Sequence, residues 1–189
     1  METLLALDHS LFLFINHLPH TLLTDTIALT LSGVLGSTVL IWLLLSIWLF
    51  VREEKRDHWF FVPVILASSL SLTITEYVLK NIFARGRPPD TLGVIQIGSK
   101  LSDYSFPSGH ATFAWALAIV LANKEPRGKW IFYGLAFFIS ASRIYLGKHY
   151  PADIVAGSIV GIVIGLCSLW LERMLVKRNH KRHQNPRNV

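Results

Sequence analysis

The chain has 189 residues, of which 52% are hydrophobic and only 16% are charged, whereas soluble domains carry about 25% charged residues. The formal net charge is +6, but long uncharged stretches interrupt the basic residues, which excludes a simple basic nucleic-acid-binding domain. Several apolar runs reach the roughly 17–25 residues that cross a bilayer as a helix, so the composition indicates an integral membrane protein. The single cysteine, Cys167, excludes an intrachain disulfide.

The N-terminal residues 4–18 predict an amphipathic helix that lies in the membrane interface. Leucine and phenylalanine recur there at helical spacing, with Asp8 and His9 between them. The first three residues lack the basic region of a secretory signal, so we expect the helix to be retained. A sixth membrane span over the same residues is the alternative.

The remaining apolar runs predict five membrane-spanning helices, separated by charged or Pro/Gly-containing connections: 22–51, 59–83, 108–123, 130–146 and 153–172. The first run exceeds one span and contains Gly33 and Gly36, which predicts a tilt or bend. We therefore expect an all-α polytopic transmembrane helix bundle. Residues 1–176 form one domain and residues 177–189 form a basic tail in this interpretation.

Basic residues in the connections predict the orientation of the bundle. Twelve of the 18 Lys and Arg residues lie in connections 52–57 and 123–129 and in the C-terminal end, and six lie in the opposite connections. The positive-inside rule places the larger group in the cytoplasm, and with it the C-terminus. Connections 84–107 and 143–152 then face outward in a multi-pass protein of the cell membrane.

The outward connections gather cations at the ends of several spans, among them Lys80, Arg87 and Arg143. Charges at membrane depth cost roughly 2.5–3.5 kcal/mol each on insertion scales, so such a group needs a compensating anion. A phosphate compensates several cations at once, because Arg offers a fork of donors and Lys a compact charge. The pattern predicts a phosphate site on the outward face.

Two helix starts face the same side. Ser108 and Gly109 precede an apolar run, where a hydroxyl and a backbone amide at a helix N-terminus can bind a phosphate oxygen. His149 and Asp153 flank the start of the last run. A carboxylate on one imidazole nitrogen leaves the other nitrogen available for attack, so His149 is a candidate nucleophile.

Three motifs together resemble the signature of the type 2 phosphatidic acid phosphatase superfamily. They are Lys80 with Arg87-Pro88, Pro107-Ser108-Gly109-His110, and Ser142-Arg143 with His149 and Asp153, in the order and spacing of that family. The resemblance covers roughly residues 60–172. The segment Asp8-His9-Ser10-Leu11-Phe12 is further similar to small bacterial members that act on undecaprenyl diphosphate.

The resemblance implies a role for each matching residue. His149 attacks phosphorus and becomes phosphohistidine, Asp153 orients it, and His110 protonates the leaving oxygen and later activates water. The expected phosphate-binding residues are Lys80, Arg87, Ser108, Gly109 and Arg143. The family uses no metal, and no residues at metal-ligand spacing accompany the motif, so we expect no metal and no cofactor.

The resulting hypothesis is a membrane lipid phosphatase whose substrate is a lipid phosphate or diphosphate, most simply undecaprenyl diphosphate. Phosphatidylglycerol phosphate and phosphatidate are alternative substrates, and a lipid phosphotransferase or an anion transporter or channel are alternative functions. Membrane lipids are the expected surroundings and nucleic acid is excluded, while the sequence leaves the oligomeric state open. Glu76 can pair with Lys80 one turn later, and Arg85 and Lys148 are either further phosphate contacts or solvated charges.

Overall fold

The computed structural model describes residues 2–32, 37–52 and 59–184, and every regular element in these ranges is a helix. This confirms the all-α class. The α-helices are α1 (Glu2–Asn16), α2 (Leu22–Ser32), α3 (Ser37–Arg52), α4 (Phe61–Leu72), α5 (Lys80–Phe83), α6 (Gly109–Lys124), α7 (Lys129–Tyr145) and α8 (Pro151–Gln184). A π-helical segment, η2 (Thr73–Leu79), joins α4 to α5, and η3 (Asp90–Leu92) and η4 (Pro126–Gly128) are short 3₁₀ turns.

The helices follow the predicted apolar runs with two differences. The run 22–51 is divided between α2 and α3, and Gly33 and Gly36 lie outside the described residues. The last helix continues beyond residue 172 to Gln184. In the described ranges, two helical stretches are long and apolar enough to cross a membrane, Phe61–Phe83 with mean hydropathy 1.6 and Pro151–Asn179 with 2.4. The helices α6 and α7 have only 16 and 17 residues.

Helix α6 is the centre of the bundle and packs most extensively against α8. Three glycines of α8, spaced four residues apart, allow the two backbones to approach closely. A Cβ atom would lie 2.6 Å from the Ser108 carbonyl oxygen at Gly157, 2.3 Å from that of Thr112 at Gly161, and 2.7 Å from that of Ala116 at Gly165. Only hydrogen side chains fit this contact, so the glycine row fixes the distance between α6 and α8.

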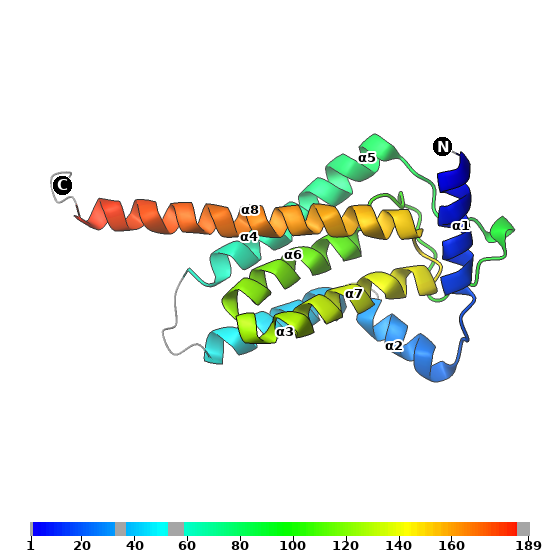
Figure 1. Ribbon diagram of the computed structural model, residues 1–189, viewed down its shortest axis with the longest axis horizontal. Helices are drawn as coiled ribbons and strands as arrows, with labels where there is room; N and C mark the ends of the chain where they lie inside the picture. Colours follow the sequence, from blue (N-terminus) through cyan, green and yellow to red (C-terminus); the bar gives the residue numbers. More distant parts are fainter. Residues whose placement is uncertain (1, 33–36, 53–58, 185–189) are drawn as a thin grey trace.

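The alternating direction of the helices brings distant parts of the sequence to one end of the molecule. Helices α5 and α7 end there, α6 and α8 begin there, and α1 lies across this end (Figure 1). The opposite end is held by an ion pair between Lys124 Nζ and Glu172 Oε1, at 2.5 Å. The fold therefore collects the connections 84–108 and 146–150 in one place.

Helix α1 turns the face with Asp8, Phe12 and Asn16 inward and its leucine-rich stripe outward. Asp8, Phe12 and Asn16 are buried, and the Asn16 side chain hydrogen-bonds the backbone of Ile95 and the carbonyl of Tyr145. Leu4 and Leu7, of the leucine-rich stripe, are exposed. Exposed apolar side chains on a helix that contacts the bundle through polar groups are typical of a membrane-facing element.

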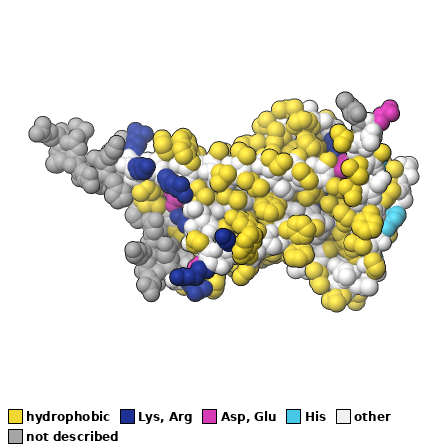
Figure 2. Space-filling view, viewed as in Figure 1, with side chains coloured by type: hydrophobic (Ala, Val, Ile, Leu, Met, Phe, Trp, Pro, Cys, Tyr) yellow, Lys and Arg dark blue, Asp and Glu magenta, His cyan; other side chains and the backbone are white. Residues whose placement is uncertain are grey.

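The outer surface of the bundle is similarly apolar. Figure 2 shows hydrophobic side chains along the length of the molecule, while Lys and Arg side chains gather toward the end where α8 terminates. On α8 itself, Val155, Ile159, Val163, Leu166 and Trp170 are exposed. Large apolar residues on the outside of a helical bundle indicate contact with lipid rather than water.

The segment η2 has i→i+5 hydrogen bonding, and the Lys80 amide donates to the Thr75 carbonyl at its end. A π turn contains more residues than an α turn, and such turns occur frequently at functional sites. Here η2 lies directly before Lys80, which is buried, and it contains Glu76.

Candidate active site

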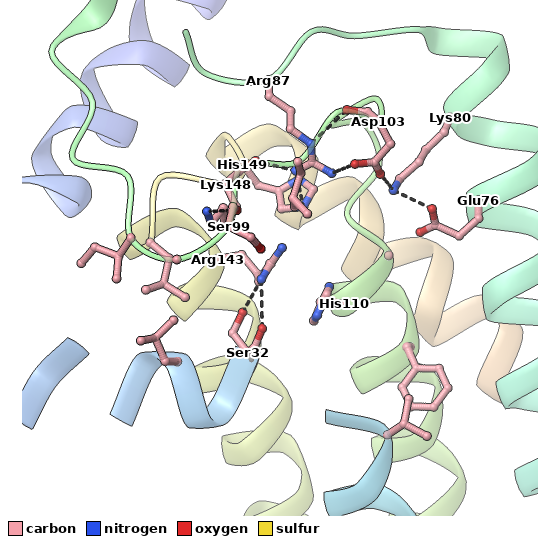
Figure 3. A pocket seen from close by; sticks show the side chains of 18 of the residues that line it. Ser32, Glu76, Lys80, Arg87, Ser99, Asp103, His110, Arg143, Lys148 and His149 are labelled. Atoms are coloured by element: carbon pink, nitrogen blue, oxygen red, sulfur yellow. Dashed lines mark hydrogen bonds and ion pairs between the residues drawn. The ribbon is translucent and has the colours of Figure 1, made fainter. Parts of the chain in front are cut away.

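A cavity of about 580 Å³ opens where α5, α6 and α7 meet. Figure 3 shows Lys80, Arg87, His110, Arg143 and His149 around it, together with Glu76, Asp103 and Lys148. Gly109 also lines the cavity. The structure thus brings together six of the eight residues singled out from the sequence, while Ser108 and Asp153 are fully buried behind its wall.

The hydrogen bonds of His149 define which ring nitrogen faces the cavity. Its Nδ1 lies 2.8 Å from the Ser105 carbonyl oxygen, and its Nε2 lies 3.2 Å from Arg87 Nη1. A carbonyl only accepts and a guanidinium only donates, so the proton is assigned to Nδ1 and a lone pair to Nε2. Burial, reinforced by the charges of Arg143, Arg87 and Lys80, holds the pKa of His149 well below its usual value. The ring is therefore neutral, as a nucleophile requires.

Asp153 lies farther from His149 than the sequence-based interpretation implies. Its Oδ2 is 3.6 Å from Nδ1, and this oxygen accepts a hydrogen bond from the Tyr150 amide at 2.9 Å. The closest acceptor to Nδ1 is the carbonyl of Ser105. Every residue type has a backbone carbonyl, so the sequence gives no signal for this acceptor, and Ser105 was not predicted.

Lys80, Arg87 and Lys148 in the cavity are paired with carboxylates or carbonyls. Lys80 Nζ binds Glu76 Oε2 at 2.7 Å and also Asp103 Oδ2, and Arg87 Nη2 binds Asp103 Oδ1 at 2.9 Å. Lys148 Nζ donates to the Ser99 carbonyl at 2.6 Å. The expected pairing of Glu76 with Lys80 is confirmed. Asp103, in contrast, was missed, since it lies in a long connection without periodicity.

The electrostatics of the cavity reflect this crowding of charge. Burial alone would raise the pKa of Asp103, but the hydrogen bond from Lys80 and the charges of Arg87 and Lys80 outweigh it and lower that pKa to about 2. Burial, with the charges of Arg143 and Arg87, lowers the pKa of Lys148 to about 8. Four cations face two carboxylates among the lining residues, which leaves a net positive charge of about +2.

Arg143 hydrogen-bonds α2 through one guanidinium nitrogen and has a further donor that no described residue uses. Its Nη1 donates to the Ser32 carbonyl at 3.0 Å and to the Ser32 Oγ at 2.7 Å. Its Nε is buried and has no hydrogen-bond partner in the described part of the chain. A buried donor without a partner is costly, and an anion in the cavity would satisfy it.

The start of α6 supplies the remaining groups. Ser108 is the N-cap, with its hydroxyl near the Ala111 amide at 3.5 Å, so the hydroxyl serves the helix and does not line the cavity. The His110 ring points into the cavity (Figure 3) and makes no hydrogen bond with any described residue. Gly109 lies against Glu76, whose Oε1 would be 2.4 Å from a Cβ atom there.

Arg85 is neither a phosphate contact nor a solvated charge. Its Nη1 binds Asp153 Oδ1 at 2.7 Å and its Nη2 binds Asp8 Oδ2 at 2.6 Å. The guanidinium also lies over the Tyr150 ring, 4.2 Å from its centroid. Asp8 and Asp153 are far apart in sequence, and no spacing rule predicts that one arginine binds both. Lys148 does line the cavity.

Comparison with known proteins identifies a matching family and several relatives. The model of the PAP2 superfamily matches residues 58–177. The chain is 30% identical to the lipid A 4'-phosphatase of Porphyromonas gingivalis over 87% of its own length and 72% of that protein. It is 28% identical to the undecaprenyl-diphosphatase BcrC of Bacillus subtilis, over 65% and 62% respectively. The crystal structure of Aquifex aeolicus LpxE superimposes with a TM-score of 0.68 and 35% identity, covering 85% of this chain and 93% of that one.

Proposed function

We propose that this chain, which belongs to the PAP2 superfamily of lipid phosphatases, hydrolyses a lipid phosphate or diphosphate through a phosphohistidine at His149. The observation that carries the proposal is the Nε2 atom of His149, which is unprotonated at the wall of a cationic cavity and accepts a hydrogen bond from Arg87 that a bound phosphate can replace. A neutral imidazole among several cations can attack an anionic phosphorus without a metal.

The geometry suggests a two-step reaction. Nε2 of His149 forms a bond to phosphorus while the bond from phosphorus to the lipid oxygen breaks, and His110, which has to be protonated for this step, gives that oxygen its proton and becomes neutral. An oxygen of water then forms a bond to phosphorus while the bond between phosphorus and Nε2 of His149 breaks, His110 takes a proton from this water, and inorganic phosphate leaves. Lys80, Arg87 and Arg143, with the Gly109 amide, bind the three non-bridging oxygens as their charge redistributes. Ser108 contributes by capping the helix that presents Gly109 and His110.

The apolar part of the cavity fits the lipid half of such a substrate. Leu29, Val39, Leu72 and Phe113 also line the cavity. These residues belong to α2, α3, α4 and α6, so an acyl or prenyl chain can pass between helices while its phosphate stays among the basic side chains. This explains why a phosphatase would be built into a membrane.

We propose undecaprenyl diphosphate as the first substrate to test, because four cations converge in the cavity and a terminal diphosphate brings more negative charge than a monoester. A second candidate is a phosphate monoester of lipid A, which is favoured by the length over which the chain matches the lipid A 4'-phosphatase. Comparing kcat/KM for these lipids, phosphatidylglycerol phosphate and phosphatidate in mixed micelles separates the candidates.

The nucleophile is tested with a radiolabelled phospholipid substrate. Wild-type protein should trap an acid-labile label, and His149→Ala should lose both label and turnover while remaining folded. His17→Ala, an exposed histidine on the same chain, is the matched control and should keep both. Turnover by His149→Ala would contradict the mechanism, and label transfer to an added lipid alcohol instead of water would identify a phosphotransferase. A transporter would release no phosphate.

We also propose that the protein crosses the membrane five times, with the cavity outside and the C-terminus in the cytoplasm. The distribution of basic residues supports this orientation, as does their concentration at the end opposite α1 (Figure 2). In a Cys167→Ser background, single cysteines at Asp90 and Asn179 can be labelled in intact cells. Labelling at position 90 alone is expected, and labelling at position 179 alone would invert the topology.

A further inference from the structure

Helix α1 lies outside the residues that the family model matches, yet it places a buried carboxylate near the proposed nucleophile. Asp8 is 8% exposed, and both of its oxygens are used. Oδ2 binds Arg85 Nη2 at 2.6 Å, and Oδ1 accepts a hydrogen bond from the Ala152 amide at the start of α8, at 2.8 Å. Burying a carboxylate is unfavourable unless it is paired, and these two contacts pair both oxygens of Asp8.

Arg85 connects Asp8 to the site. Its two terminal nitrogens bind one carboxylate each, Asp8 on one side and Asp153 on the other. Burial alone would lower the pKa of Arg85, but the hydrogen bond to Asp8 and the charge of Asp153 outweigh it and raise that pKa. The guanidinium is therefore a permanent cation between two anions, and its planar fork fixes their relative positions.

Asp153 is thereby held from both of its oxygens. Oδ1 is bound by Arg85, and Oδ2 accepts from the Tyr150 amide and lies 3.6 Å from His149 Nδ1. With Arg85 in place the carboxylate cannot rotate without breaking a charged hydrogen bond. The distance between Asp153 and the imidazole therefore depends on where Asp8 holds Arg85.

The charges of the three side chains also matter for the reaction. When Nε2 forms a bond to phosphorus, the imidazole ring becomes positively charged at the Nδ1–H side. Arg85 alone would cancel the charge of Asp153. The second carboxylate, Asp8, leaves the group of Asp8, Arg85 and Asp153 with a net charge of about −1, which stabilises the developing positive charge on His149.

We propose that α1 is part of the catalytic apparatus, with Asp8 acting as a positioning residue that holds Arg85, and through it Asp153, beside His149. This inference rests on the proposed function. It predicts that a residue outside the three family motifs controls the chemical step and not the binding of the lipid.

The test compares Asp8→Asn with wild-type protein in the phosphate-release assay. The variant keeps an oxygen for the Ala152 amide but loses the charge that faces Arg85, so we expect kcat to fall about ten-fold while KM stays within two-fold. The matched control is Asp25→Asn, which likewise removes the negative charge from an ion pair, the one with His20, while keeping an acceptor oxygen for Tyr145. It should leave kcat within two-fold. The melting temperature of each variant is measured to check that it is folded.

A double-mutant cycle tests whether Asp8 acts through Arg85. In an Arg85→Gln background, Asp8→Asn should lower kcat by less than two-fold further, because the connection is already broken. Asp8→Glu, which restores the charge, should recover most of the loss and is the variant to use if Asp8→Asn does not fold. An unchanged kcat, a loss confined to KM, or full additivity with Arg85→Gln would overturn the inference. If wild-type protein releases phosphate from none of the lipids, the proposed function fails and this inference with it.

Discussion

Substitutions at the three glycines of α8 test whether the distance between α6 and α8 determines the geometry of the candidate active site. Gly157→Ala, Gly161→Ala and Gly165→Ala each add one methyl group at the contact with α6. The new carbon would lie 2.3–2.7 Å from a backbone carbonyl oxygen, whereas nonbonded heavy atoms prefer about 3.5 Å. Because a backbone cannot rotate out of the way as a side chain does, the two helices must separate by about 1 Å.

The magnitude of the effect has two parts. Overpacking of this kind costs about 1–3 kcal/mol of stability, which the higher helix propensity of Ala offsets by up to about 1 kcal/mol. Activity depends on which end of the contact moves. Gly157 lies against Ser108, the N-cap beside His110, whereas Gly165 lies against Ala116, about 12 Å further along the helix. A displacement near 1 Å at reacting groups can lower the rate about 100-fold.

We therefore expect similar losses of stability but a graded loss of activity, with kcat lowest for Gly157→Ala, intermediate for Gly161→Ala and least affected for Gly165→Ala. Thermal unfolding in detergent and kcat for phosphate release measure the two quantities. Gly134→Ala, in α7, is the matched control, because no atom lies within 4 Å of a Cβ placed there, and it should preserve both. Full activity and stability in Gly157→Ala, or a larger loss of kcat in Gly165→Ala, would refute the reasoning.

Three further predictions concern the charges of the cavity. Asp103→Asn removes an anion that competes for Lys80 and Arg87, so orthophosphate should inhibit about five-fold more tightly, while Asp90→Asn, on the same connection, should change nothing; weaker inhibition would show that Asp103 positions the cations. Lys148, with its pKa lowered to about 8, is charged below that pH, so KM should rise as pH passes about 8, and Lys148→Met should remove this rise. Activity should persist in EDTA, and a loss restored by a divalent cation would contradict the metal-free mechanism.

Much of the candidate site could be predicted from the sequence, because the hydropathy pattern and the alternating direction of the helices lead to the same arrangement. Hydropathy locates the ends of the helices, and the alternation of helix direction then places Lys80, His110 and His149 at the same end of a bundle. Pro151 at the start of α8 and Ser108 at the start of α6 are common residues at helix N-termini, and both are found there.

The remaining contacts depend on tertiary structure that leaves no periodic signal. Asp103 reaches two cations from a connection whose path the sequence does not define, and Ser105 acts through its carbonyl. Asp8 and Arg85 are separated by 77 positions. Residues 4–18 lie mostly in the expected amphipathic helix, and its face with Asp8, Phe12 and Asn16 contacts the bundle, because the leucine-rich stripe of a helix in a membrane faces the lipid.

The π-helical segment Thr73–Leu79 acts as a phase shift between two surroundings. One extra residue in a turn rotates everything beyond it by about 100° around the helix axis relative to an uninterrupted α-helix. Helix α4 can therefore pack in the bundle with its own periodicity, while past the shift Lys80 turns into the cavity and Ile82 and Phe83 stay outside. The chain thus sets the direction of Lys80, a proposed phosphate-binding residue, independently of the packing of the helix that precedes it.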